Sequence, residues 1–248
     1  MEAAIITGAL GGIGRSLCDV YAERGYQVIG VDKLSRPGDF AHDFVQYDIS
    51  TLHTVPNAFE GFRQKVLDLV GNNDLRVLVN NAAVQVVKNT DVLTWEDWEL
   101  TFGTNVFAPF FLVRAFLPEL RASSGAVINM GSIHARLTKA EFTAYSTSKG
   151  ALVSLTRAMA LDLAPEVRVN AILPAATDTP MLRAGFEGNP EGFRLLGEYH
   201  PLKRIALPEE VAKVAVFLSS SESSFVTGST IWVDGGIGGV LNDPVFAR

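Results

Sequence analysis

Seven short runs of apolar and β-branched residues alternate along this chain with longer segments of helical periodicity. Each run has the length and composition of a strand. The runs comprise residues 3–7, 27–32, 44–47, 76–79, 126–130, 168–172 and 230–233. The clearest helical segments comprise residues 95–121, 143–164 and 209–218. Because strands that alternate with helices pair in parallel and carry helices on both faces, we expect an α/β fold with a doubly wound parallel sheet.

The length of the chain favours a single domain. Its 248 residues, 48% of them hydrophobic, suffice for one substantial core, so we expect one domain over residues 1–248. Pro37 and Gly38 predict a loop in place of one crossover helix. Residues 181–202 combine glycines and prolines with a short helical stretch, and we expect them to form a lid over the substrate. From about residue 236 the strand pattern ends, and we expect a C-terminal tail. The lid carries the apolar residues Met181, Leu182, Phe186, Phe193 and Leu196.

Composition argues against several classes of partner and site. The net charge is −6 and no cluster of Lys and Arg is present, so we expect no nucleic-acid partner. The apolar N-terminal run lacks a charged leader and is broken by glycines, so we expect neither a signal sequence nor a membrane span. The single cysteine, Cys18, favours a reducing cytoplasm. The four histidines are scattered, and we expect no bound metal.

The first strand runs directly into the segment TGALGGIG, which opens a helix. Glycines at Gly8, Gly12 and Gly14 allow a tight turn and let backbone N–H groups approach a pyrophosphate at the positive end of the helix. Asp32 ends the second strand, about 20 residues on, where an acidic group holds an adenosine ribose. Alternatively, the glycines serve a turn that binds nothing and Asp32 is a solvated carboxylate. The combination favours NAD over NADP, although Lys33 or Arg15 would weaken this preference if either pointed inward.

The segment YSTSK places Tyr145 and Lys149 four residues apart, on one face of a predicted helix. A tyrosine ordinarily ionises near pH 10, and a neighbouring ammonium lowers its pKa toward the range useful for acid–base chemistry. By itself the pair is also compatible with two exposed helix residues.

These features together resemble the classical short-chain dehydrogenase/reductase family over nearly the whole chain. TGALGGIG matches the family's TGxxxGxG turn, NNAA at 80–83 resembles its NNAG motif, and Asn105, Ser132, Tyr145 and Lys149 have the order and spacing of its catalytic tetrad. The resemblance implies a Rossmann-like fold. It also implies that Tyr145 is the general acid/base, that Ser132 binds the substrate oxygen, that Lys149 grips the nicotinamide ribose and lowers the tyrosine pKa, and that Asn105 holds a water in a proton relay.

The expected cofactor is NAD (NADH). Its expected contacts combine the glycine turn, the second and third strand ends, the NNAA motif, the catalytic pair and the segment after the sixth strand: Gly8, Leu10, Gly12, Ile13, Gly14, Asp32, Asp48, Ile49, Asn81, Ala82, Ala83, Tyr145, Lys149, Pro174, Thr177 and Thr179. Ala83 and Ala175 stand where the family usually has glycine, and each adds a methyl group near the nicotinamide. Expected substrate contacts are Ser132, His134 and Tyr145.

Four of these residues also have a plainer interpretation. Ser132 could be a cap and Asn105 a buried structural amide, while Asp48 could be a helix N-terminal carboxylate and His134 a solvated loop side chain.

We expect an NAD(H)-dependent oxidoreductase that interconverts a secondary alcohol and a carbonyl on a small substrate such as a polyol, a sugar-like compound, a cyclic alcohol or a keto acid. The alternatives are a catalytically silent NAD-binding sensor or scaffold and an epimerase or dehydratase related to the family. We expect a homotetramer in the cytoplasm, with no membrane partner.

Overall fold

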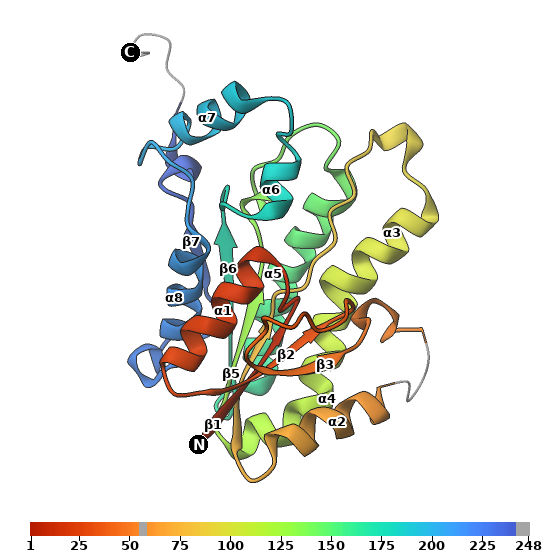
Figure 1. Ribbon diagram of the computed structural model, residues 1–248, viewed down its shortest axis with the longest axis vertical. Coiled ribbons are helices and arrows are strands. Elements are labelled where there is room, and N and C mark those ends of the chain that lie inside the picture. Colours follow the sequence, from red (N-terminus) through yellow and green to blue (C-terminus); the bar gives the residue numbers. More distant parts are fainter. Residues whose placement is uncertain (55–58, 242–248) are drawn as a thin grey trace.

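The computed structural model describes residues 1–54 and 59–241, and within them the strands form one parallel sheet in the order β3-β2-β1-β4-β5-β6-β7 (Figure 1). The strands are β1 (Glu2–Thr7), β2 (Gln27–Asp32), β3 (Asp43–Gln46), β4 (Asp74–Asn80), β5 (Ala126–Met130), β6 (Arg168–Pro174) and β7 (Thr230–Val233). Each lies on one of the seven apolar runs, so the predicted single-domain, doubly wound α/β fold is confirmed.

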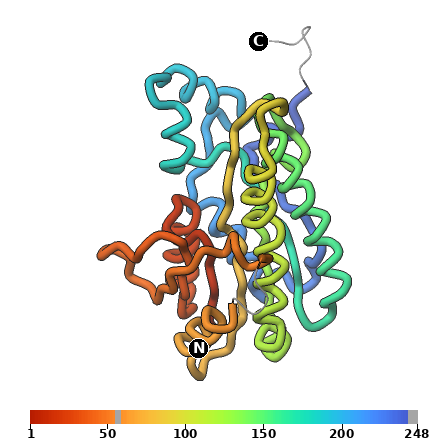
Figure 2. The backbone as a smooth tube through the Cα atoms, turned by 90° about the vertical axis from the view of Figure 1, so that its right-hand side faces the viewer, coloured from red at the N-terminus to blue at the C-terminus, as the bar shows by residue number. Residues whose placement is uncertain are grey.

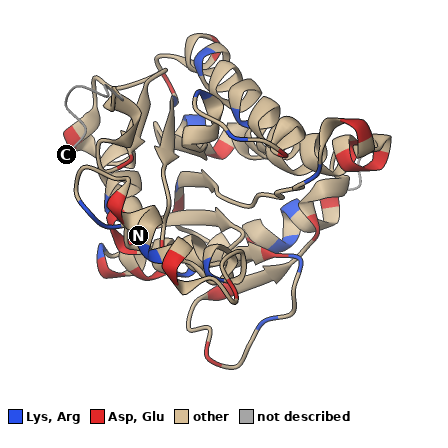
Figure 3. Ribbon diagram, turned by 90° about the horizontal axis from the view of Figure 1, so that it is seen from above, with Lys and Arg blue, Asp and Glu red and all other residues tan. Residues whose placement is uncertain are grey.

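Helices cover both faces of this sheet. On one face lie α1 (Gly12–Glu23) and α8 (Pro208–Ser219), which pack against each other and against the strands. On the other face lie α2 (Glu60–Val70), α4 (Ala108–Ala122) and α5 (Thr143–Leu163). Figure 2 shows α4 and α5 running side by side. Charged residues of both signs lie around the periphery in a view from above (Figure 3).

The two-sided cover explains why the strands read as continuous apolar runs. In β1, Ile5 belongs to the core beneath α4 and α5, whereas Ile6 belongs to the core beneath α1 and α8, and both side chains are fully buried. Successive strand residues point to opposite faces, so a strand between two helix layers has no polar face. Complete burial of such a side chain stabilises the fold by roughly 1.5–3 kcal/mol.

The predicted helix over residues 95–121 is interrupted. It consists of α3 (Trp95–Phe102), a π-helical turn η3 (Gly103–Phe107) and α4. A wide π-helical turn within a long helix is frequent at functional sites, and Asn105 lies in this one. The whole segment Trp95–Ala122 is apolar and long enough to cross a membrane by composition alone, but 56% of its most apolar window is buried inside the domain.

The remaining elements are short. Residues 33–42 form the predicted loop, and they contain no helix. Between β6 and α8 lie α6 (Pro180–Ala184) and α7 (Pro190–Glu198), within the segment predicted to be a lid. The 3₁₀ turns are η1 (Ile49–Thr51), η2 (Thr90–Val92), η4 (Ile133–Ala135), η5 (Ser221–Ser223) and η6 (Ile237–Gly239). The predicted tail includes η6, and residues 242–248 lie outside the described part.

Candidate active site

A cleft of about 1200 Å³ opens at the carboxyl ends of the strands. Its walls come from the segments that follow β1, β2, β4, β5 and β6, together with residues of α6 and α7. In open parallel sheets this edge is where ligands bind. The volume exceeds that of an ordinary small-molecule pocket, which is about 300–1,000 Å³, and therefore leaves room for two ligands side by side.

The glycine turn forms one end of the cleft. Gly8 has φ +64°, and a Cβ atom there would lie 2.8 Å from Cα of Ala82. A Cβ atom at Gly14 would lie 1.9 Å from the carbonyl oxygen of Gly8, so neither position accepts a side chain. Helix α1 begins here with Gly11 as its N-cap, which offers no capping side chain. Its first N–H groups are therefore available to an anion.

Asp32 lies beside this turn, half-buried at the end of β2. Its Oδ2 accepts a hydrogen bond from the N–H of Leu10 at 3.1 Å, and its Oδ1 accepts one from the N–H of Leu34 at 3.1 Å. On the other side, Asn81 donates from Nδ2 to the carbonyl oxygens of Thr7 at 2.9 Å and Gly8 at 3.2 Å. The turn is thus held from two strands, and the carboxylate has a fixed position in the cleft.

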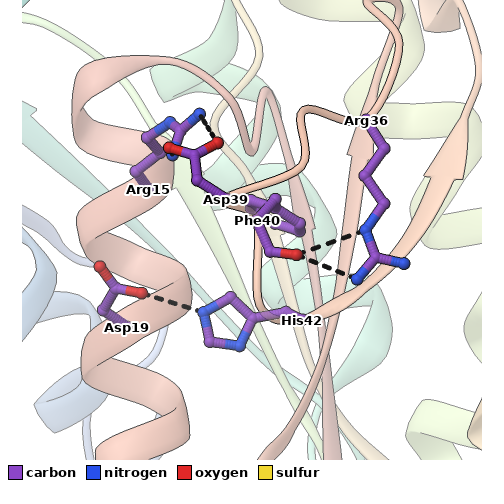
Figure 4. A network of polar contacts seen from close by, with 6 residues as sticks. All are labelled: Arg15, Asp19, Arg36, Asp39, Phe40 and His42. Atoms are coloured by element: carbon purple, nitrogen blue, oxygen red, sulfur yellow. Dashed lines mark hydrogen bonds and ion pairs between the residues drawn. The ribbon is translucent and has the colours of Figure 1, made fainter.

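The loop after β2 ties up most of the nearby basic side chains (Figure 4). Arg15 makes a two-armed contact with Asp39, with Nη1 to Oδ2 at 3.1 Å and Nη2 to Oδ1 at 3.4 Å. Arg36 donates to the carbonyl oxygen of Phe40, and Nε2 of His42 lies 2.9 Å from Oδ1 of Asp19. The Arg15 guanidinium holds the pKa of Asp39 below its usual value.

Of the two cations that could oppose Asp32, Arg15 is therefore engaged by a carboxylate. Lys33 lines the cleft, and its ammonium forms no ion pair with the residues that the structure describes.

Three predicted catalytic residues meet in the middle of the cleft. Ser132 follows β5, while Tyr145 and Lys149 face the same space from α5. Nζ of Lys149 donates to the carbonyl oxygen of Met130 at 2.8 Å and lies 5.6 Å from the ring centroid of Tyr145. Burial lowers the pKa of Lys149 to about 8. Burial also raises the pKa of Tyr145, and a hydrogen bond with Ser132 acts in the opposite direction.

Asn105 does not line the cleft with the other three; it is buried behind them. Its Oδ1 accepts from the N–H of Val84 at 2.8 Å, and its Nδ2 donates to the carbonyl oxygen of Val84 at 2.9 Å and to Oγ of Ser148 at 2.9 Å. Oγ of Ser148 donates in turn to the carbonyl oxygen of Tyr145 at 2.7 Å. The amide therefore fastens the loop after β4 to the helix turn that carries Tyr145. Its predicted part in a proton relay stays a prediction.

His134 lies next to the catalytic tyrosine, in the η4 turn. Its ring stacks on Phe142 with centroids 4.6 Å apart and planes at 9°, and it meets the Tyr145 ring edge-on at 5.6 Å and 72°. Its Nδ1 lies 3.1 Å from Oγ1 of Thr138. Burial, with a smaller contribution from Lys139, lowers the pKa of His134 to about 4, so the ring is neutral near pH 7. It is not the solvated loop residue of the plainer interpretation.

The remaining predicted cofactor contacts also line the cleft. They are Leu10, Gly12, Ile13, Asp48, Ile49, Ala82, Ala83, Pro174, Thr177 and Thr179. Asp48 caps η1 by accepting from the N–H of Ser50, and Thr179 caps α6 by accepting from the N–H of Leu182. Ala83 and Ala175 both avoid the left-handed region, so their methyl groups cause no backbone strain.

Several cleft residues escaped the sequence analysis. From the segment between β5 and α5 come Leu137, Thr138 and Phe142, and from the segments after α7 and β7 come His200 and Ile237. The one available signal was position, because the first group lies between two predicted catalytic residues. Of the predicted apolar lid residues, Met181, Leu182, Phe186 and Leu196 line the cleft, whereas Phe193 packs edge-on against Phe186 at 5.7 Å.

Comparison with known proteins gives consistent matches over nearly the whole chain. A family model described as enoyl-(acyl carrier protein) reductase matches residues 8–238. Cyclopentanol dehydrogenase of a Comamonas species is 33% identical over 248 residues, which cover 95% of this chain and 96% of the relative. The ligand-free aldohexose dehydrogenase of Thermoplasma acidophilum superposes with a TM-score of 0.90 at 30% identity, covering 100% of this chain and 97% of that one. A 4-hydroxyisoleucine dehydrogenase complexed with NADH superposes with a TM-score of 0.86 at 26% identity, covering 97% of this chain and 100% of that one.

Proposed function

Because the chain belongs to the classical short-chain dehydrogenase/reductase family and is an oxidoreductase of that type, we propose that it interconverts a secondary alcohol and a carbonyl on a small substrate with NAD(H). The observation that carries the proposal is the shared cleft. One end is a glycine turn with an uncapped helix N-terminus, and the middle holds Ser132, Tyr145 and Lys149 within reach of one small molecule.

The residues present fit a nicotinamide dinucleotide. Gly8 and Gly14 form a cradle that a Cβ atom would fill, and the N–H groups at the start of α1 suit a pyrophosphate. Asp32 suits the hydroxyls of an adenosine ribose, and Asp48, Ile49 and the NNAA segment would enclose the adenine and ribose. Lys149, Pro174, Thr177 and Thr179 would hold the nicotinamide half. When bound, NAD supplies a hydride acceptor, and NADH supplies a hydride donor.

Preference for NAD over NADP follows from charge. The carboxylate of Asp32 would repel a 2′-phosphate by roughly 4 kcal/mol at 4 Å with an effective dielectric near 20. Arg15 offsets less of this repulsion while its guanidinium is paired with Asp39. Lys33 also lines the cleft, and its positive charge reduces the preference for NAD over NADP. Because this residue is exposed to solvent, its charge is screened and the reduction is small. The similar 4-hydroxyisoleucine dehydrogenase forms a complex with NADH, which supports the same choice.

Proton transfer is the work of the chain's own residues. In the oxidative direction, Tyr145 as phenolate accepts the hydroxyl proton of the substrate, and Ser132 donates a hydrogen bond to the same oxygen. Burial raises the pKa of Tyr145. The ammonium of Lys149, 5.6 Å from the centroid of the tyrosine ring, acts in the opposite direction because it stabilises the negatively charged phenolate. In the reductive direction Tyr145 returns the proton to the oxygen. Asn105 keeps the turn bearing Tyr145 in place.

The test is a screen for NADH absorbance with a panel of alcohols, polyols, cyclic alcohols and hydroxy acids. We expect turnover of at least one secondary alcohol with NAD. Tight NAD binding without turnover across the panel would instead support a silent NAD-binding sensor. Loss of stereochemistry or of water from a substrate, without net change in NAD, would support an epimerase or dehydratase.

We also propose that the chain acts as a homotetramer in the cytoplasm. Large apolar side chains are exposed on the helical segments along one face of the sheet: Trp95 is 76% exposed and Leu161 is 83% exposed, and Phe107 and Phe110, between them in sequence, are 41% and 42% exposed. Surfaces of this kind are typical of association between subunits. Light scattering at micromolar concentration checks the assembly, and a monomer there would contradict it.

A further inference from the structure

The proposed function leaves open what else the substrate carries besides the reacting hydroxyl. We propose that His134 and Lys139 form a carboxylate subsite, so that the substrate is a small hydroxy acid or the corresponding keto acid. This inference rests on the proposed function, because it places the carboxylate relative to Tyr145 and Ser132. Both residues lie in the segment between β5 and α5, and both line the cleft.

His134 has a fixed orientation next to the reacting position. Phe142 stacks on one side of its ring, and Tyr145 meets it edge-on with ring centroids 5.6 Å apart. Its backbone N–H donates to Oγ of Ser132 at 3.2 Å, so the imidazole moves with the serine. A small molecule whose oxygen contacts Tyr145 and Ser132 therefore reaches His134 with a group only two or three bonds from the carbinol carbon.

The hydrogen bonding of His134 leaves a donor for the substrate. Its Nδ1 pairs with the hydroxyl of Thr138, and no residue in the described ranges bonds to Nε2. When Thr138 donates to Nδ1, the proton of the neutral imidazole lies on Nε2. A carboxylate selects this tautomer, because a carboxylate oxygen only accepts hydrogen bonds.

Lys139 supplies the charge. Its Nζ lies 4.7 Å from the centroid of the Phe142 ring, on which His134 also stacks. It forms no ion pair within the described residues, whereas Lys88 and Arg183, near the same end of the molecule, are paired with Asp97 at 2.7 Å and Asp178 at 2.6 Å.

Glu141 is the acidic neighbour that lines this part of the cleft. Besides burial, it is the positive charge of Lys139 that lowers the pKa of His134, as expected for an ammonium near the imidazole. The electrostatic environment beside the imidazole is therefore positive, which favours an anion there. Met181, Leu182 and Phe186, which also line the cleft, are apolar and offer no hydrogen-bond donor side chain to a carboxylate.

The experiment compares acids with matched neutral compounds. The probes are 2-hydroxybutanoate and 3-hydroxybutanoate, their methyl esters, and 2-butanol, each with NAD. We expect the wild type to prefer one of the acids. Lys139→Met and His134→Phe, which keeps an aromatic ring against Phe142, should each lower kcat/KM for that acid by roughly 10- to 100-fold, the range for a hydrogen bond or contact to a charged group. The same variants should lower kcat/KM for the matched ester by a smaller factor, so that the ratio of kcat/KM for the acid to kcat/KM for the ester falls in both.

Two controls separate this role from a structural one. Arg136 lies in the same segment but does not line the cleft. Arg136→Met removes its charge and should leave the ratio of kcat/KM for the acid to kcat/KM for the ester unchanged. Thr138→Val removes the hydroxyl that sets the tautomer and should lower the ratio, whereas Thr138→Ser should restore it. Binding of butanoate and of butanamide to the protein–NADH complex, measured by calorimetry, gives a readout that needs no turnover.

The outcomes distinguish the subsite from the proposed function. The subsite would be overturned if kcat/KM for 2-butanol or an ester equals that for the acids and if Lys139→Met and His134→Phe leave the acid-to-ester ratio of kcat/KM unchanged. The proposed oxidoreductase function would still hold in that case. Absence of turnover with every probe would count against the proposed function. In that case, butanoate binding that is weakened in both variants would still support the subsite, and binding that is equal for butanoate and butanamide would overturn it.

Discussion

Replacing Lys149 by methionine should abolish turnover and yet leave the fold as stable as before, or more so. Lys149 is 2% exposed, and burial lowers the pKa of its ammonium from the ordinary 10.5 to about 8. This change corresponds to roughly 3 kcal/mol by which burial destabilises the charged form at neutral pH. Methionine has a similar length without the charge, so Lys149→Met removes that penalty.

The substitution also removes a hydrogen bond. Nζ of Lys149 donates to the carbonyl oxygen of Met130 at 2.8 Å, and leaving this acceptor without its donor costs about 1–3 kcal/mol. The two effects oppose each other. At pH 7 the free energy of unfolding of Lys149→Met should therefore lie between that of the wild type and a value about 2 kcal/mol higher.

The pH dependence separates this explanation from ordinary repacking. The native pKa of about 8 lies below the unfolded value of 10.5, so between these two pH values the unfolded chain holds more protons than the native protein. The free energy of unfolding of the wild type should then rise with pH across this window, and the variant should lack that rise. Any advantage of Lys149→Met at pH 7 should consequently shrink or reverse by about pH 10.

The assay is urea unfolding of both proteins at pH 7, 8.5 and 10, at one protein concentration because association affects apparent stability. Lys213→Met, at an exposed lysine paired with Glu209 on α8, serves as the control and should change stability by less than about 0.5 kcal/mol. The reasoning would be refuted if Lys149→Met lowers the free energy of unfolding by several kcal/mol at pH 7. It would also be refuted if the difference in free energy of unfolding between the variant and the wild type does not change with pH.

Three further predictions concern other parts of the cleft. Asp32→Ala should raise kcat/KM for NADP relative to NAD, and Asp39→Asn should do so more weakly by releasing the guanidinium it holds; a wild type that already prefers NADP would contradict both. Asn105→Ala should lower the free energy of unfolding by roughly 2–4 kcal/mol, because one buried and two partly buried hydrogen bonds are lost, and a loss below about 0.5 kcal/mol in urea unfolding would count against its fastening role. Residues 181–202 should become more protected from hydrogen exchange when NADH and a substrate analogue bind; unchanged protection, with unchanged substrate preference in Phe186→Ala, would remove support for a lid.

The strands and the glycine turn could be predicted because their causes are local. Ile5 and Ile6 both have to be apolar in a strand covered on two faces, and Gly8 is required by its own backbone conformation. Pro37 and Gly38 likewise indicated a loop, which the structure contains. Each of these signals lies within a few residues of the feature that it predicts.

The setting of Asn105 could not be read in the same way. Its partners, Val84 and Ser148, are 21 and 43 residues away in sequence, and the π-helical turn around it leaves no mark in the apolar periodicity. The surroundings of His134 depend similarly on the fold, since the orientation of its ring and its lowered pKa come from burial against Phe142 and Tyr145. Contacts between distant segments decide both cases, and a single sequence does not contain them as a pattern.

The central claim is that Tyr145 transfers the proton in an NAD-dependent oxidation, and Tyr145→Phe tests it most directly. The substitution keeps the ring that packs against His134 and Phe142 and removes only the hydroxyl. Steady-state NADH absorbance with the best alcohol of the panel, beside calorimetric titration with NAD, separates chemistry from binding. We predict that kcat falls by roughly 100-fold or more while the Kd for NAD changes by less than about threefold. Turnover close to that of the wild type would contradict the proposed mechanism.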